Sequence, residues 1–193
     1  MAHKNIEIEI QVTIENSKPL LDFLIKEGEF KYEKRQLDEY FTPKENDYTA
    51  VRPINEWLRL REAEGKYSIN YKNWYDEEKG HSIHCDEYET EIKDLEQMKK
   101  VLLALDFRSL VVVDKIRKVY HYQDFEVAID KVKGLEDSVE MEYIGRDEKA
   151  VPKEVGASMI DFLKKIGVGK IKENYQGYPF LLLFPKEAKW EEV

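Results

Sequence analysis

The stretch Ile6-Glu7-Ile8-Glu9-Ile10-Gln11-Val12 alternates strictly between apolar and polar residues. A period of two residues is typical of a β-strand with one apolar face and one polar face. Two carboxylates and an amide share the polar face. The pattern therefore has two interpretations: a half-buried strand whose acids lie in solvent, or a strand that holds cations between its carboxylates.

The composition indicates one globular domain covering residues 1–193, because 193 residues suffice for one sizeable core. Hydrophobic residues make up 42% of the chain and charged residues 37%. The formal net charge of -9 argues against a non-specific nucleic-acid binder, which needs a basic face. A local cluster of basic residues still allows a small anionic ligand.

The single cysteine, Cys85, excludes an intrachain disulfide. The N-terminal residues lack the apolar core of a signal peptide, and no stretch approaches the roughly 20 apolar residues of a membrane helix. We therefore expect a cytoplasmic protein that does not contact membranes.

Periodicity predicts about eight strands and three helices. The predicted strands after the first are Phe30 to Phe41, Trp57 to Ala63, Tyr67 to Lys72, His84 to Ile92, Ser109 to His121, Asp124 to Lys131 and Asp137 to Tyr143. Helices are predicted to begin near Ser17, after Asp94 and at Pro152. The segment Tyr175 to Phe184 fits either a short helix or a covering strand, and Lys186 to Val193 is expected to be a frayed tail.

The polar faces of these strands carry charges sorted by sign, whereas solvated faces normally mix the signs. Acids occupy the first and last strands, and bases occupy middle strands. Eight antiparallel strands can close into a barrel that encloses one small ligand. The charged faces would then point inward, and the helices would cover the outside. An ordinary antiparallel sheet with a wet outer face is the alternative, and periodicity alone does not distinguish the two.

A bound triphosphate would explain why acidic and basic side chains face the same enclosed space. Arginine and lysine bind phosphate oxygens directly, while carboxylates repel them unless a divalent cation bridges the two. The inward arrangement is therefore a metal–triphosphate site.

The first strand resembles the Glu-x-Glu-x-Lys signature of the CYTH superfamily, the triphosphate tunnel metalloenzymes. That family includes class IV adenylyl cyclases, thiamine triphosphatases and tripolyphosphatases. Further stretches resemble its motifs in the same order: Asp38-Glu39-Tyr40-Phe41, Leu58-Arg59-Leu60-Arg61, Tyr71-Lys72, Glu87-Tyr88-Glu89, Asp114-Lys115-Ile116-Arg117, Val127-Ala128-Ile129-Asp130 and Glu140-Met141-Glu142.

The resemblance implies a mainly β, α+β fold: a closed eight-stranded antiparallel barrel with helices packed outside. It implies that Mg2+ or Mn2+ is bound by Glu7, Glu9, Glu140 and Glu142, with Asp130 and Glu89 as helpers. It implies that ATP, thiamine triphosphate or tripolyphosphate is held by Arg59, Arg61, Lys72, Lys115 and Arg117. A monomer or a homodimer is expected.

Two positions depart from the family pattern. Gln11 stands where the signature has lysine, which in triphosphatase members is thought to activate water together with a tyrosine, here Tyr40. Gly134-Leu135-Glu136-Asp137 replaces the usual Gly-Leu-Gly. Three functions follow as hypotheses: a metal-dependent triphosphatase, an adenylyl cyclase that releases pyrophosphate, and a non-catalytic triphosphate-binding protein.

Overall fold

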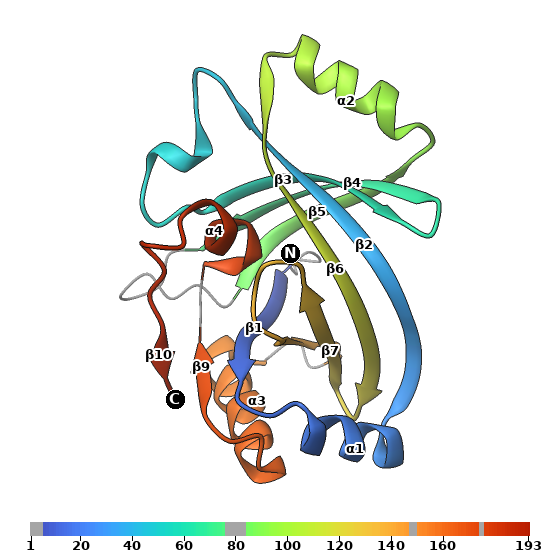
Figure 1. Cartoon of the computed structure of the whole chain (residues 1–193), viewed down its shortest axis with the longest axis vertical. Helices are drawn as coiled ribbons and strands as arrows, with labels where there is room; N and C mark the ends of the chain where they lie inside the picture. The colour runs from blue at the N-terminus through green and yellow to red at the C-terminus, as the bar shows by residue number, and fades with distance from the viewer. Residues whose placement is uncertain (1–5, 76–83, 147–149, 174–175) are drawn as a thin grey trace.

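The computed structural model describes residues 6–75, 84–146, 150–173 and 176–193, except for the side chains of Ile6, Glu7 and His84. Within these residues it contains ten strands and four α-helices (Figure 1). The strands are β1 (Ile6–Ile14), β2 (Glu29–Pro43), β3 (Glu56–Ala63), β4 (Lys66–Trp74), β5 (His84–Ile92), β6 (Phe107–Tyr122), β7 (Phe125–Val132), β8 (Ser138–Tyr143), β9 (Ile171–Glu173) and β10 (Glu191–Glu192). The helices are α1 (Lys18–Glu27), α2 (Leu95–Ala104), α3 (Pro152–Ile166) and α4 (Gly177–Leu183).

The strands form one antiparallel sheet in the order β10-β9-β1-β5-β4-β3-β2-β6-β7-β8. Strand β1 pairs with β5 through Ile6–Ile8, with β8 through Glu9–Thr13 and with β9 through Val12–Ile14. The predicted mainly β, antiparallel architecture with helices is therefore confirmed.

Short turns connect β3 to β4, β6 to β7 and β7 to β8. Between β3 and β4, Glu64 and Gly65 have φ of 52° and 75°, a two-residue turn that matches the twist of paired strands. This turn keeps β3 and β4 in register, so that Arg59 lies opposite Asn70 and Trp57 opposite Lys72. One face of the hairpin consequently carries all four of these side chains.

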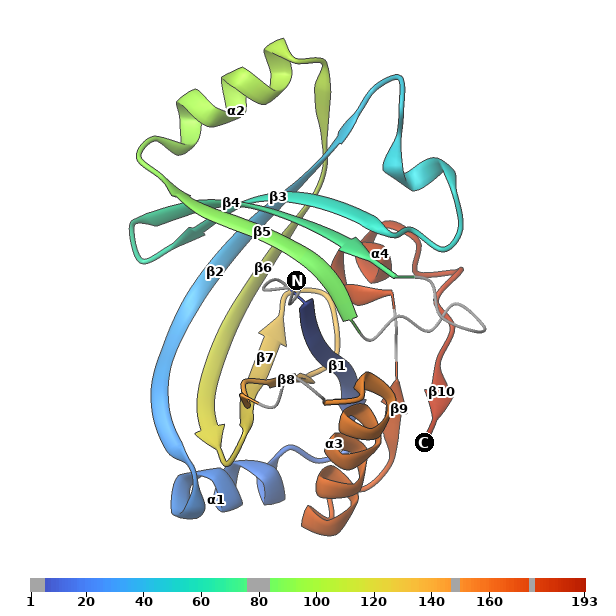
Figure 2. The ribbon, with the colours of Figure 1, turned by 180° about the vertical axis from the view of Figure 1, so that it is seen from behind.

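The helices cover apolar faces of the strands (Figure 2). Leu20 and Leu24 of α1 and Leu163 of α3 pack with Ile10 of β1 and Met141 of β8 in the largest apolar cluster. A separate cluster joins Leu102 of α2 to Phe41, Leu58 and Leu60. Each of these strand residues alternates with a polar residue that faces the other way, so the apolar side of the sheet lies beneath the helices.

Helix ends follow the predicted signals. The Asp94 carboxylate accepts a hydrogen bond from Gln97 N at 2.9 Å, capping α2. Helix α3 begins at Pro152 and ends at Gly167, whose φ of 81° is the left-handed conformation that glycine favours. None of the described helices combines the length and the apolar character needed to cross a bilayer.

The C-terminal region was predicted least well. The undecided segment Tyr175 to Phe184 contains a helix, α4. The expected frayed tail is wrong in part, because β10 pairs with β9 and Val193 N donates to Ile171 O at 3.1 Å. Two- and three-residue strands are too short to show alternation, which explains why the sequence pattern missed them.

Candidate functional site

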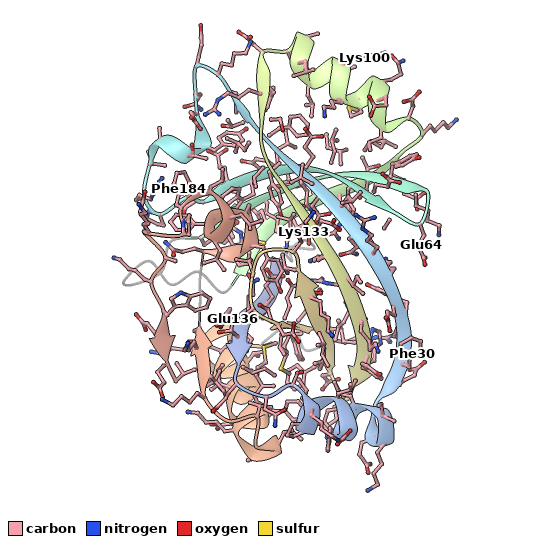
Figure 3. All side chains as sticks on the ribbon, viewed as in Figure 1. Phe30, Glu64, Lys100, Lys133, Glu136 and Phe184 are labelled. Atoms are coloured by element: carbon pink, nitrogen blue, oxygen red, sulfur yellow. The ribbon has the colours of Figure 1, made fainter. Side chains whose placement is uncertain are left out.

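A cavity of about 350 Å³ lies among the polar faces of the strands, which we call the inner faces. Figure 3 shows all described side chains as sticks, with Phe184 beside α4 on the left and Glu64 at the β3–β4 turn on the right. The predicted site residues that line the cavity are Glu9, Gln11, Tyr40, Arg59, Arg61, Lys72, Glu89, Lys115, Arg117, Glu140 and Glu142. The structure therefore brings together residues from seven strands.

Asp130 does not line the cavity but is fully buried beside it. The side chain of Glu7 lies outside the described residues. The backbone of Glu7 pairs with Cys85 of β5. Its predicted metal-binding role consequently stays a prediction.

Arg117 is the centre of a buried charge network. Its Nε and Nη2 donate to both oxygens of Asp130 at 2.8 and 2.5 Å, and its Nη1 lies 2.6 Å from Glu140 Oε1. Burial alone would raise the pKa of Glu140, but Arg117 and Lys115 outweigh it and hold that pKa well below its usual range. Glu140 is therefore a carboxylate at neutral pH, and Arg117 is fixed by a two-pronged contact.

Asp130 uses both oxygens within the protein. Besides Arg117, it accepts hydrogen bonds from Lys115 Nζ at 3.2 Å and from the Tyr178 hydroxyl at 2.9 Å. This arrangement fits a residue that positions cations better than one that coordinates a metal directly. Sequence reasoning missed Tyr178, because its contact with Asp130 spans 48 residues and leaves no local pattern.

Lys115 is 3% exposed and lies 5.0 Å above the ring of Tyr178. Burial and the neighbouring Arg117 lower its pKa to about 8, despite the opposing effect of Asp130. An anion in the cavity would stabilise the charged form of this lysine.

Asp38 holds the arginines of β3. Arg61 donates to its two oxygens at 2.6 and 2.8 Å, and Arg59 Nη1 lies 3.7 Å away. Burial would raise the pKa of Asp38, but Arg59 and Arg61 lower it strongly. The sequence indicated that Asp38 belongs to a motif and shares a strand face with Tyr40, but Asp38 was not assigned a role in the site.

Tyr40 lies opposite Arg59 in the β2–β3 pair. Burial raises the pKa of its hydroxyl, so the side chain is a neutral phenol near pH 7. A neutral phenol can donate a hydrogen bond to a phosphate oxygen or to water. It is a poor base at that pH.

Acids gather where β1, β7 and β8 meet. Glu9 lies opposite Glu142, and Glu142 lies opposite Glu126. Burial, Glu9 and Glu126 raise the pKa of Glu142 to about 7. Lys72 Nζ, 3.2 Å from Glu9 Oε2, offsets part of this repulsion.

These acids suit a divalent cation by chemistry, because carboxylate oxygens are the ligands that Mg2+ and Mn2+ prefer. Burial is the main cause of the raised pKa of Glu142, and repulsion from Glu9 and Glu126, which a bound cation would relieve, adds to it. Among the described residues no group of three His, Cys, Asp or Glu side chains already has the spacing of a metal site. Glu9, Glu89, Glu140 and Glu142 are the predicted metal-binding residues whose side chains are described and which line the cavity.

Gln11 faces the cavity with an unused donor. Its Nε2 is buried and has no hydrogen-bond partner among the described residues. Its Oε1 faces Gly177, where a side-chain carbon would lie 3.7 Å away. The Nε of Arg59 is buried without a partner in the same way. Both atoms are donors, so they suit a ligand that supplies acceptors.

Aromatic residues line the cavity near α4. Trp57 and Tyr178 belong to one cluster with Tyr40, and Trp74 packs against that cluster. The rings of Tyr40 and Trp57 meet edge to face at 5.6 Å. Sequence analysis did not assign the tryptophans to the site, yet Trp57 shares the strand phase of Arg59. That phase was the signal that could have placed it there.

The comparisons with known proteins agree with this geometry. The CYTH domain family model matches residues 4–178. A Methanocaldococcus jannaschii protein that bears the provisional name adenylate cyclase is 31% identical over 175 residues, which cover 88% of this chain and 96% of that protein.

Solved structures share the fold. A Pyrococcus horikoshii protein has a TM-score of 0.74 at 24% identity, with 94% of this chain and 99% of that chain covered. A Hippeastrum protein, described as an adenylyl cyclase candidate with a dominant triphosphatase activity, has a TM-score of 0.64 at 20% identity, with 93% and 95% covered.

Proposed function

Because the chain belongs to the CYTH domain family, we propose that it binds a triphosphate together with a divalent metal ion and hydrolyses it. The observation that carries the proposal is the convergence on one cavity of the five predicted basic residues with four of the predicted metal-binding acids, Glu9, Glu89, Glu140 and Glu142. Strand β8 pairs with β1, and on this basis we propose that β1 to β8 form the closed barrel around the ligand.

The basic residues hold the phosphate chain in this proposal. Arg59 and Arg61 come from β3, Lys72 from β4, and Lys115 and Arg117 from β6, so they surround the cavity from three strands. Each is preorganised by a carboxylate partner, which reduces the entropy lost on binding. Asp130 acts as a positioning residue for Lys115 and Arg117.

Glu9, Glu140 and Glu142 would hold Mg2+ or Mn2+, with Glu7 and Glu89 added from the family resemblance. The bound ion supplies polarisation of the phosphoryl oxygens and neutralises developing charge. The chain's own contribution is to orient the phosphates. Tyr40 donates a hydrogen bond from its neutral hydroxyl, and Gln11 donates one from its unpaired Nε2.

The aromatic residues near α4 favour an organic triphosphate such as ATP or thiamine triphosphate. Trp57 and Trp74 offer flat apolar surfaces in a cavity that is also lined by many charged residues. This feature also supports the second candidate, an adenylyl cyclase, in which the ribose hydroxyl attacks the α-phosphate and pyrophosphate leaves. A binding protein without turnover is the third, supported by the loss of an amine at Gln11.

One experiment separates the three. Metal-stripped protein is incubated with Mg2+ or Mn2+ and with ATP, thiamine triphosphate or tripolyphosphate, and the products are resolved by chromatography. Phosphate release supports the hydrolase, whereas cyclic AMP with pyrophosphate refutes it in favour of the cyclase. Binding without products refutes both enzymes.

Two matched variants test where the chemistry occurs. Arg59→Met removes a cation from the inner face, and Arg35→Met removes one from the outer face of β2, where Arg35 pairs with Asp114. We expect loss of binding and turnover for Arg59→Met and little change for Arg35→Met. Equal effects would refute the assignment of the cavity as the site.

A further inference from the structure

Lys34 is an inner-face cation that the predicted site does not include. It lies on β2 in phase with Tyr40, two residues from Gln36 and four from Asp38. In the β2–β6 register it is directly opposite Arg117. Its Nζ lies 4.0 Å from the ring centre of Tyr32, a residue that lines the cavity. Lys34 is half-buried and contacts Tyr32 of the cavity wall, although it does not itself line the cavity.

The five predicted phosphate-binding residues each have a carboxylate within 4.0 Å. The pairs are Arg59 with Asp38, Arg61 with Asp38, Lys72 with Glu9, Lys115 with Asp130, and Arg117 with both Asp130 and Glu140. Lys34 has no ion pair within the part of the chain that the structure describes. It differs in this respect from its neighbours on the inner face.

The electrostatic surroundings of Lys34 are unfavourable. Burial and the positive charge of Arg61 lower its pKa, with a further contribution from Arg117, while Glu64 and Glu126 oppose the change. Cations placed opposite one another on adjacent strands repel. A bound anion at this position would relieve the repulsion further, because none of the described carboxylates forms an ion pair with Lys34.

Lys34 also has a defined place along the cavity. Tyr40 belongs to the aromatic cluster near α4, and Lys34 lies six residues away on the same strand face. At about 3.3 Å per residue the separation is about 20 Å. Lys34 and Tyr32 consequently occupy the side of the cavity away from the tryptophans. A phosphate chain whose organic group contacts Trp57 would extend toward them, past Arg117.

We propose that Lys34 and Tyr32 form a subsite for the terminal phosphoryl group of the bound phosphate chain. This inference rests on the proposed function, because it requires that the cavity binds such a chain. Lys34 supplies the charge and a donor, and the Tyr32 hydroxyl supplies a second donor. Phosphate oxygens are the acceptors that match both.

The test compares two phosphate-chain analogues that differ in length and cannot be hydrolysed. Binding of methylenediphosphonate and of the bis-methylene triphosphonate is measured by calorimetry in Mg2+. The proteins are wild type, Lys34→Met and the control Lys31→Met. Lys31 lies on the same strand at the bulge between Phe30 and Tyr32, outside the cavity lining, and pairs with Glu29 at 2.8 Å. Circular dichroism melting checks that each variant is folded.

We expect Lys34→Met to weaken triphosphonate binding by about tenfold, as for loss of one charged hydrogen bond, and diphosphonate binding by less than about twofold. Lys31→Met should leave both unchanged, and Lys34→Arg should restore the affinity. Equal affinities for wild type and Lys34→Met, or an equal loss for both ligands, would overturn the subsite. If wild type binds neither ligand, the proposed function itself fails along with it.

Discussion

Replacing Glu142 by glutamine should make the metal-free protein more stable at alkaline pH. Burial, Glu9 and Glu126 raise the pKa of Glu142 from 4.5 to about 7. The folded state therefore favours the protonated acid more strongly than the unfolded chain does. The contribution of protonated Glu142 to the free energy of unfolding is fully present below pH 4.5 and is lost as the pH rises through about 7. Glutamine cannot ionise, so the Glu142→Gln variant does not lose this free energy of unfolding as the pH rises.

The magnitude follows from the pKa change. A rise from 4.5 to about 7 corresponds to about 3.4 kcal/mol at about 1.36 kcal/mol per pH unit. Glu142 retains partial contact with solvent, which screens the repulsion, so we expect about 1–2 kcal/mol. The variant should gain this free energy of unfolding over wild type between pH 5 and pH 8.

Urea unfolding in EDTA at pH 5, 6, 7 and 8 measures the difference. The exposed Glu136 provides the control, because Glu136→Gln removes an acid from a surface turn without changing the cavity. Saturating Mg2+ should flatten the pH dependence of wild type, since a bound cation balances the acids. A difference between Glu142→Gln and wild type that stays constant across pH would refute the reasoning.

Three further predictions test other parts of the site. Gln11→Lys should raise the rate of phosphate release if the missing amine limits hydrolysis. A steady-state assay with tripolyphosphate measures this rate, and an unchanged or lower rate with binding intact would contradict the prediction. Tyr178→Phe should lower the free energy of unfolding by about 1–2 kcal/mol, because Asp130 loses a buried hydrogen bond of 2.9 Å; urea unfolding measures it, and no change would contradict it. Trp57→Ala should weaken ATP binding but not tripolyphosphate binding in calorimetry, and equal losses would argue against an aromatic subsite.

Side-chain direction was the part of the site that the sequence predicted well. A strict two-residue period fixes which residues share a face once one of them is placed, so Arg59 and Arg61 had to point the same way. The sorting of charge by strand then indicated that acids and bases converge. The cavity contains Arg59, Arg61, Lys115 and Glu142 together, as that argument requires.

Pairing within the site could not be predicted in the same way. Asp130 had been grouped with the metal-binding acids, yet its oxygens are occupied by Arg117, Lys115 and Tyr178. Periodicity states that a carboxylate faces inward but not which cation it meets. The position of helix α4 could not be predicted either, because it depends on contacts with β6, which is remote from α4 in the sequence.

The charge balance of the cavity links the metal to the substrate. The five predicted phosphate-binding cations already have carboxylate partners, and the pKa of Glu142 is raised because this residue is buried and faces the acids Glu9 and Glu126. A triphosphate alone would add further negative charge to that of these acids. A divalent cation offsets it and gives the acids a favourable partner. The phosphate chain and the metal ion should therefore bind cooperatively, which reconciles an anionic substrate with a chain whose formal net charge is -9.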